Sequence, residues 1–237
     1  MTHLANARLT AHWAAQLPSA PGTTLLENTG DFSHTNLVWS ADLQALVGQP
    51  VNGKSAALRI ADLTLLVGDD VLELADHTYE HAMRWLGERF SAELHRSEHE
   101  MPSFGVADGA PFGRVEGLVE LAGLFDRAHA ALSTVGPPVR CWPHHFDMAT
   151  LVDLGSGRSI GVGMSPGDQA TPEAYWYVTP WPYPTDVSDL PVLSEGRWHT
   201  EGWVGAVLPG LIDPLSFLPQ AVAACHAVLN RTSQEPA

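Results

Sequence analysis

The hydrophobic positions near the N-terminus repeat at the spacing of an α-helix. Leu9, Trp13 and Leu17 lie four residues apart, so in a helix they share one face. Pro18 follows directly and lacks the N–H group that would continue the helix. The pattern therefore predicts a first helix over 3–17 that ends at Pro18.

Three later segments also favour helices, at about 77–94, 114–133 and 214–230. Asp76 is the expected N-cap residue of the first of them, because its carboxylate can accept hydrogen bonds from the free N–H groups at a helix start. The run Gly136-Pro137-Pro138 predicts the end of the second.

Between the first two helices the pattern changes to that of β-strands. Strands are expected near 36–39, 43–47, 57–67 and 70–74, with a hairpin turn at Gly68-Asp69-Asp70. More strands are expected between the third helix and the last. This order predicts an α+β fold, with antiparallel sheet flanked by four to five helices. We expect one domain over 1–237, with two packed lobes, 1–100 and 101–237, as the alternative.

A predicted strand over 139–152 carries the first candidate chemistry. Side chains alternate between the two faces of a strand, so His145 and Asp147 are expected on one face and His144 on the other, among large apolar side chains. We interpret His144 as a core histidine that hydrogen-bonds to the backbone.

A second predicted strand, 198–203, repeats the arrangement of a histidine and an acid two residues apart. The alternation places His199, Glu201 and Trp203 on one face. If this strand lies near the first, both pairs converge on one point.

The predicted catalytic set consists of these four side chains: His145, Asp147, His199 and Glu201. Two imidazoles and two carboxylates suit a divalent metal ion such as zinc, iron or manganese. They equally suit metal-free proton transfer between a histidine and a carboxylate. A third interpretation is a buried polar network that only fixes the register of the sheet. The residues alone leave all three open.

Residues expected to contact a ligand are polar or aromatic and come from nearby turns and strands: His34, Asp168, Trp142, Trp176, Trp181 and Trp203. Asp168 follows a Ser-Pro-Gly turn, where it either stabilises the turn or projects at a strand end. The loop 31–36 likewise either meets a ligand or forms an Asx-type turn. The stretch 174–184 alternates aromatic residues and ends in prolines. It is either an edge strand that cannot pair further or an aromatic wall for a planar or sugar-like ligand.

Charge limits the partners of this chain. Its 27 Asp and Glu residues outnumber its 12 Lys and Arg residues, for a net charge of −15. Nucleic acids and anionic membranes need a basic surface, so neither is an expected partner. Two cysteines without metal-site spacing, and the lack of a long apolar segment, predict a cytoplasmic protein. A small-molecule ligand is expected, and a homo-oligomer remains open.

Two segments, 77–81 and 95–99, match the His-x-x-Glu-His pattern of one class of zinc peptidase. In the predicted helix, His77 and His81 lie opposite the apolar face, so they should face solvent instead of a sheltered cleft. We interpret both segments as chance matches in a chain with 12 histidines.

Over most of its length the chain resembles a family of uncharacterised bacterial proteins. The resemblance rests on Trp-Pro-His-His-Phe-Asp at 142–147 and Ser-Pro-Gly-Asp at 165–168. It implies a shared architecture and no activity, cofactor or site residue. The leading hypothesis is thus a small-molecule enzyme, hydrolytic in one version, that uses the histidine and carboxylate set. The alternative is a non-catalytic protein that binds a small ligand in an aromatic cleft.

Overall fold

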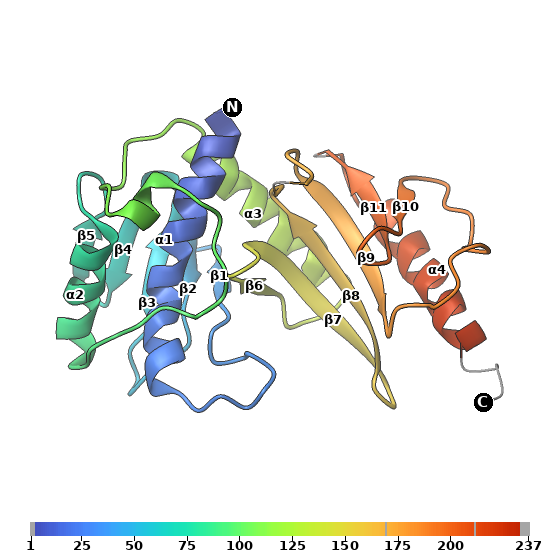
Figure 1. Ribbon diagram of the computed structural model, residues 1–237, viewed down its shortest axis with the longest axis horizontal. Helices are drawn as coiled ribbons and strands as arrows, with labels where there is room; N and C mark the ends of the chain where they lie inside the picture. Colours follow the sequence, from blue (N-terminus) through green and yellow to red (C-terminus); the bar gives the residue numbers. More distant parts are fainter. Residues whose placement is uncertain (1–2, 169, 211, 233–237) are drawn as a thin grey trace. The chain divides into compact units, whose positions relative to one another are not determined.

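The α+β class is confirmed by a computed structural model that describes residues 3–168, 170–210 and 212–232 (Figure 1). These residues form four α-helices and two antiparallel sheets. The chain makes two compact units, Met1–Arg127 with Arg140–Phe146, and Ala128–Val139 with Asp147–Ala237. The alternative division into lobes placed the boundary near residue 100. In the structure the chain passes from one unit to the other three times, after Arg127, after Val139 and after Phe146.

The sheet of the first unit is a meander of five short strands in sequence order: β1 (Val38–Ser40), β2 (Ala45–Val47), β3 (Ala56–Arg59), β4 (Thr64–Val67) and β5 (Asp70–Glu73). Each strand pairs antiparallel with the next. The predicted strand over 57–67 is in fact two strands, because the 3₁₀ helix η1 (Ile60–Asp62) and the left-handed Leu63 reverse the chain. A continuous apolar run does not reveal such a turn.

Helix α1 (His3–Leu25) packs on β2 and β3 and is longer than the sequence predicts. The expectation that Pro18 ends it is wrong, since both Pro18 and Pro21 lie inside the helix. Each proline removes one helical hydrogen bond, yet this part of the helix is buried, and Leu17 is 0% exposed. Packing against the sheet outweighs the local penalty.

Two helix starts also differ from the prediction. Helix α2 (Tyr79–Phe90) packs on α1 and is capped by Thr78, whose hydroxyl accepts a hydrogen bond from the His81 N–H at 3.2 Å. Asp76 is therefore not the N-cap, and with a φ of 66° it belongs to the preceding turn. Helix α3 (Leu118–Ser133) begins four residues later than expected, and the first unit also holds the 3₁₀ helix η2 (Gly105–Asp108).

A turn interrupts the predicted strand over 139–152. Strand β6 (Arg140–Trp142) ends before residues 143–146, and β7 (Asp147–Gly155) begins after them. In the turn the Phe146 N–H donates to the Trp142 carbonyl at 2.7 Å, and Phe146 has a φ of 56°. Alternation does not continue through a turn, so the inference that His145 and Asp147 share a strand face is wrong.

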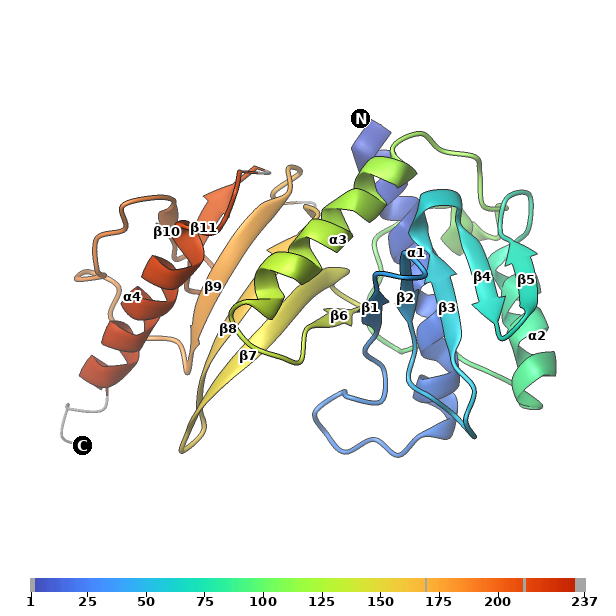
Figure 2. The same ribbon diagram turned by 180° about the vertical axis from the view of Figure 1, so that it is seen from behind.

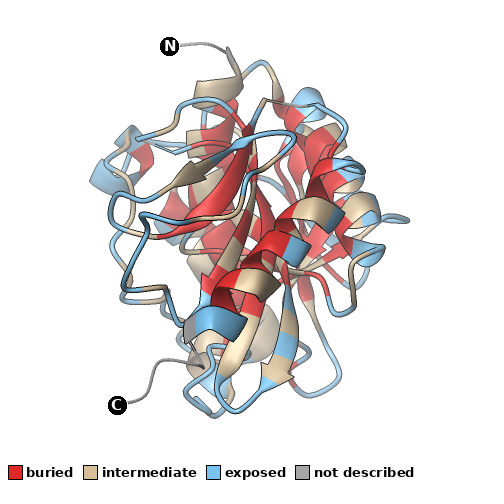
Figure 3. Ribbon diagram, turned by 90° about the vertical axis from the view of Figure 1, so that its right-hand side faces the viewer, coloured by how far each residue is buried: buried red, intermediate tan, exposed pale blue. Residues whose placement is uncertain are grey.

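The second unit contributes five strands of an antiparallel sheet, in the order β10-β11-β9-β8-β7. Besides β7, these are β8 (Arg158–Ser165), β9 (Tyr175–Trp181), β10 (Arg197–His199) and β11 (Gly205–Pro209). Helix α4 (Phe217–Thr232) packs on β8, β9 and β11 and covers one face (Figure 2). In this unit, buried residues lie on α4 and on the strands that it covers (Figure 3).

Strand β9 lies inside the sheet, between β8 and β11, so the interpretation of 174–184 as an edge strand is wrong. Its Pro180 pairs with Ile160 of β8. The register with β11 reaches only Val178, so no β11 residue lies opposite Pro180. On the β11 side, therefore, a missing N–H at Pro180 leaves no hydrogen bond between strands unmade.

Candidate functional site

The candidate site lies on the face of the second sheet that α4 leaves open. In the described part of the second unit no helix covers this face (Figure 1). Alternation along β9 buries Trp176 and Val178 against the helix side and turns Tyr175 and Tyr177 to the open side. The register brings Val207 of β11 beside Tyr177.

Glycines on this face let aromatic rings lie directly on the sheet. A Cβ atom added at Gly163 of β8 would lie 2.3 Å from the Tyr177 ring, which therefore covers this glycine. A Cβ added at Gly205 of β11 would lie 2.5 Å from the Trp203 ring. The two rings are 6.3 Å apart between centroids and meet edge to face.

A cavity of about 630 Å³ opens beside these rings. This volume is within the range of small-molecule sites. Its aromatic lining comes from Tyr175, His199 and Trp203. The charged residues of its lining are Asp168, Glu173, Glu201 and Arg197. Three carboxylates against one guanidinium make the lining net acidic.

Asp168 holds one wall of the cavity in place. One carboxylate oxygen accepts a hydrogen bond from the Thr171 N–H at 2.6 Å, and the other accepts one from the Tyr175 hydroxyl at 2.9 Å. Burial raises the pKa of Tyr175, and the negative charge of Asp168 raises it further. The phenol therefore stays protonated and donates to Asp168, which keeps the Tyr175 ring at the edge of the cavity.

His199 and Trp203 form the opposite wall. Their ring centroids are 4.4 Å apart. The His199 Nε2 atom lies 2.7 Å from the Glu201 carbonyl oxygen. A carbonyl only accepts, so Nε2 is the donor, and in a neutral imidazole Nδ1 is then the acceptor. The partner of this histidine is the main chain of Glu201, whereas the sequence hypothesis required its carboxylate.

Asp147 lies on the same open face, at the start of β7. One of its carboxylate oxygens accepts a hydrogen bond from the Tyr177 hydroxyl. This contact reaches across β8 to β7 and fixes the Tyr177 ring over Gly163 of β8. Asp147 thus supports the aromatic surface through Tyr177.

The structure brings together some of the predicted site residues and separates others. Asp168, His199, Glu201 and Trp203 line the one cavity described above. Glu201 and Trp203 reach the cavity from a turn that follows β10. Strand β10 ends at His199, so the alternation of strand faces does not explain the position of Glu201. Of the predicted catalytic set, Asp147 belongs to the second unit with them, whereas His145 belongs to the first.

The remaining predicted contacts lie elsewhere. Trp176 is 3% exposed and faces α4, so it is a core residue. Trp181 is 55% exposed and does not line the cavity. Trp142 and His34 belong to the first unit. Their roles as ligand contacts at this site have no geometric support within the second unit.

The lining residues missed as ligand contacts include Tyr175, Arg197 and the acid Glu173. The alternation of β9 could have found Tyr175, because it places Tyr175 and Tyr177 opposite the buried Trp176. Nothing in the sequence around Arg197 identifies its role, which depends on its pairing with Val207.

The donor groups also bear on the metal hypothesis. Among the described residues, no three or more His, Cys, Asp or Glu side chains are grouped so that they could hold a metal ion. The metal-ligand role of His145, Asp147, His199 and Glu201 stays a prediction from the sequence.

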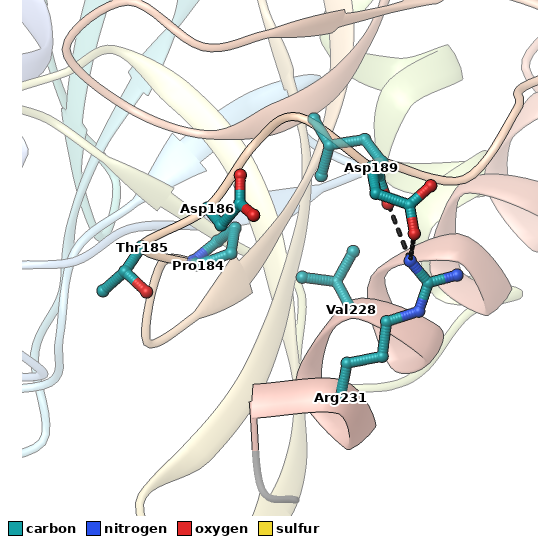
Figure 4. A pocket seen from close by; sticks show the side chains of 7 residues that line it. Pro184, Thr185, Asp186, Asp189, Val228 and Arg231 are labelled. Atoms are coloured by element: carbon teal, nitrogen blue, oxygen red, sulfur yellow. Dashed lines mark hydrogen bonds and ion pairs between the residues drawn. The ribbon is translucent and has the colours of Figure 1, made fainter. Parts of the chain in front are cut away.

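Another hollow in the second unit is a weaker candidate (Figure 4). It lies between the segment after β9 and the end of α4, where Arg231 bonds the backbone oxygen and the carboxylate of Asp189 at 2.7 and 2.8 Å. Its volume is about 160 Å³, below the usual size of a ligand site.

Comparisons with known proteins add no further assignment. No protein-family model, curated protein or solved structure matches this chain. Within the described residues, no helix is both long enough and apolar enough to cross a lipid bilayer.

Proposed function

We propose that this protein binds a small organic cation in the cavity of its second unit, a molecule with an amine or ammonium group on an apolar body. The observation that carries the proposal is the lining itself, where the rings of Tyr175, His199 and Trp203 meet the carboxylates of Asp168 and Glu201. Aromatic faces attract cations through their π electrons, and carboxylates add direct charge pairing.

The charge of the chain supports the same ligand class. A net charge of −15 attracts cations over distances up to the screening length and raises their local concentration near an acidic cavity. The one guanidinium of the lining, Arg197, is exposed and is outnumbered by the carboxylates. An anionic ligand would meet repulsion at this cavity.

The hydrogen bonds of the polar side chains in the cavity wall favour a binding role over a catalytic one. The His199 Nε2 atom is bound to the backbone, and Asp168 is bound to Tyr175 and Thr171. These bonds hold the walls of the cavity in position. The enzyme hypothesis based on His145, Asp147, His199 and Glu201 stays a prediction, and the open aromatic cavity supports the binding alternative.

The test is a calorimetric titration with three molecules of similar shape: benzylamine, benzyl alcohol and benzoate. Benzylamine should bind saturably, benzyl alcohol should bind more weakly, and any heat from benzoate should be unchanged by Trp203→Ala, because the acidic lining of this cavity repels anions. Trp203→Ala should weaken benzylamine binding by about 5- to 30-fold, which corresponds to about 1–2 kcal/mol for a cation–π contact. Glu201→Gln should weaken it in the same direction.

Trp181→Ala is the matched control, because Trp181 is an exposed tryptophan of the same unit outside the cavity lining. It should leave the affinity unchanged. The proposal fails if benzylamine does not bind, if benzyl alcohol binds equally well, or if Trp181→Ala and Trp203→Ala weaken binding equally.

A further inference from the structure

The first unit contains a cluster of aromatic and imidazole rings that the site in the second unit does not use. Phe32, in the loop after α1, lies at its centre. Its ring centroid is 6.5 Å from that of His34, 5.3 Å from that of His99 and 6.2 Å from that of His144. The His99 and His144 rings stack with centroids 4.2 Å apart. Three chain segments thus gather three imidazoles around one phenyl ring.

A cavity of about 390 Å³ opens at this cluster. Its lining includes Phe32, His34 and His99, together with His95 and Arg96 from the segment after α2. This segment is held against α1, because the His95 N–H donates to the Thr24 hydroxyl at 3.0 Å. The Arg96 guanidinium lies over the Trp13 ring, 5.6 Å from its centroid.

His34 provides the observation that points to a ligand. Its side chain is buried, with 9% exposure, and its Nδ1 atom has no hydrogen-bond partner among the described residues. A buried nitrogen without a partner destabilises the folded state, since it has lost its bonds to water. A ligand in the cavity that His34 lines can supply the missing bond.

The chemistry of the lining selects the ligand class. Imidazole N–H groups and a guanidinium are donors, and the guanidinium fork matches the two oxygens of a carboxylate or phosphate. Arg96 donates hydrogen bonds to the carbonyl groups of Ser97 and His99, in both cases from its Nη1 atom. Glu98 is the acid of this lining and opposes an anion. No group of described residues here could hold a metal ion.

We propose that this cavity of the first unit binds a small oxyanion, a carboxylate or phosphate group, through Arg96 and the imidazoles of His34, His95 and His99. The proposal is independent of the cation site, because the two cavities have no residue in common. An anion beside such a cluster meets N–H donors in a partly desolvated place.

The experiment titrates the full-length protein with inorganic phosphate, with benzoate and with acetate, at constant ionic strength and in a buffer without oxyanions. Calorimetry gives the affinity, and NMR spectra of the histidine rings locate the site. At least one anion should bind saturably and shift the ring signals of His34 and His99. Tighter binding of phosphate would assign a phosphate ligand, and tighter binding of benzoate than acetate would assign a carboxylate on a ring that contacts Phe32.

Charge variants separate this site from general attraction. Arg96→Gln should weaken binding about fivefold or more, and Glu98→Gln should strengthen it by a few-fold, because each removes one charge beside the anion. Arg84→Gln is the matched control, an exposed arginine of the same unit outside this cavity. Saturable binding lost only in Arg96→Gln supports the proposal. The proposal is overturned if none of the three anions binds the wild-type protein, or if Arg84→Gln weakens binding as much as Arg96→Gln does.

Discussion

At the scale of single residues, glycines decide where the aromatic side chains of the second unit lie. Tyr177 covers Gly163 and Trp203 covers Gly205, at distances that no Cβ atom tolerates. Neither glycine has a positive φ, so the reason for glycine is space above the strand and not backbone conformation. The flat aromatic surface beside the cavity depends on these two missing side chains.

Gly163→Ala should therefore destabilise the protein by about 1–3 kcal/mol, because the new methyl group displaces the Tyr177 ring and breaks its contact with Asp147. Urea unfolding measures this change. In a Tyr177→Ala background the same substitution should cost much less, since the ring that it meets is gone. Equal costs in the two backgrounds would contradict this account.

His12 makes the stability of the first unit depend on pH. Burial lowers its pKa from 6.5 to about 4, and its ring stacks on Phe146 with centroids 5.2 Å apart. The unfolded chain then binds more protons than the folded one between these two values. Stability from this group is fully present above about pH 6.5, falls as the pH decreases toward about 4, and is constant below that.

His12→Gln should remove this part of the pH dependence. The free energy of unfolding of the wild-type protein should fall between pH 7 and pH 4.5 by on the order of 1–3 kcal/mol more than that of the variant. Urea unfolding at the two pH values measures it. His81→Gln, at a half-buried histidine of α2, serves as the control and should behave as the wild type. The same fall in the His12 variant would refute the assignment.

At the scale of elements, α1 shows how tertiary packing overrides a local signal. Pro18 and Pro21 would end an isolated helix, and yet the helix continues to Leu25. Its backbone lies so close to neighbouring chain that a Cβ at Gly48 would be 2.0 Å from the Pro18 carbonyl oxygen. A Cβ at Gly22 would be 2.1 Å from the His34 carbonyl oxygen. Two glycines thus permit the close approach that buries the helix.

Gly48→Ala should cost about 3 kcal/mol of stability, because backbone atoms cannot move aside as a flexible side chain can. Thermal and urea unfolding measure the loss. Gly113→Ala is the matched control in the same unit, since a Cβ there has no atom within 4 Å. A loss for Gly48→Ala no greater than for Gly113→Ala would show that α1 tolerates a larger separation.

At the scale of the whole molecule, charge is the dominant feature. The net charge of −15 implies repulsion among many carboxylates. The five described ion pairs lie on the surface, with at least one partner in each pair 49% exposed or more. Exposed pairs contribute little, so self-repulsion should outweigh them.

Raising the NaCl concentration from about 10 to 150 mM should therefore raise the melting temperature, because the screening length falls from roughly 30 to 8 Å. Differential scanning calorimetry measures the shift. Sucrose, which carries no charge, controls for the effect of a cosolute. A melting temperature that falls with NaCl would mean that the attractive pairs dominate.

The periodicity of the sequence predicted most of the helices and strands. Each of its errors occurs at one place in the chain and has a physical cause. Amphipathic spacing located all four helices, because a buried face needs apolar residues wherever the fold places it. The strand over 139–152 failed because a turn at Phe146 leaves the β-favouring composition unchanged while ending the alternation. The inference that His145 and Asp147 share a strand face is wrong for that reason.

The sequence by itself determined the α+β class and the acidic net charge, and it indicated Asp168, His199, Glu201 and Trp203 as candidate site residues, since composition and spacing act locally. Only the tertiary structure decided which of these residues share a cavity. Strand register placed Arg197 beside Val207, and the turn after β10 returned Trp203 to His199. The pairing of β9 with β11 brought Tyr175 to the same cavity from farther away in the chain, and no local pattern encodes such a pairing.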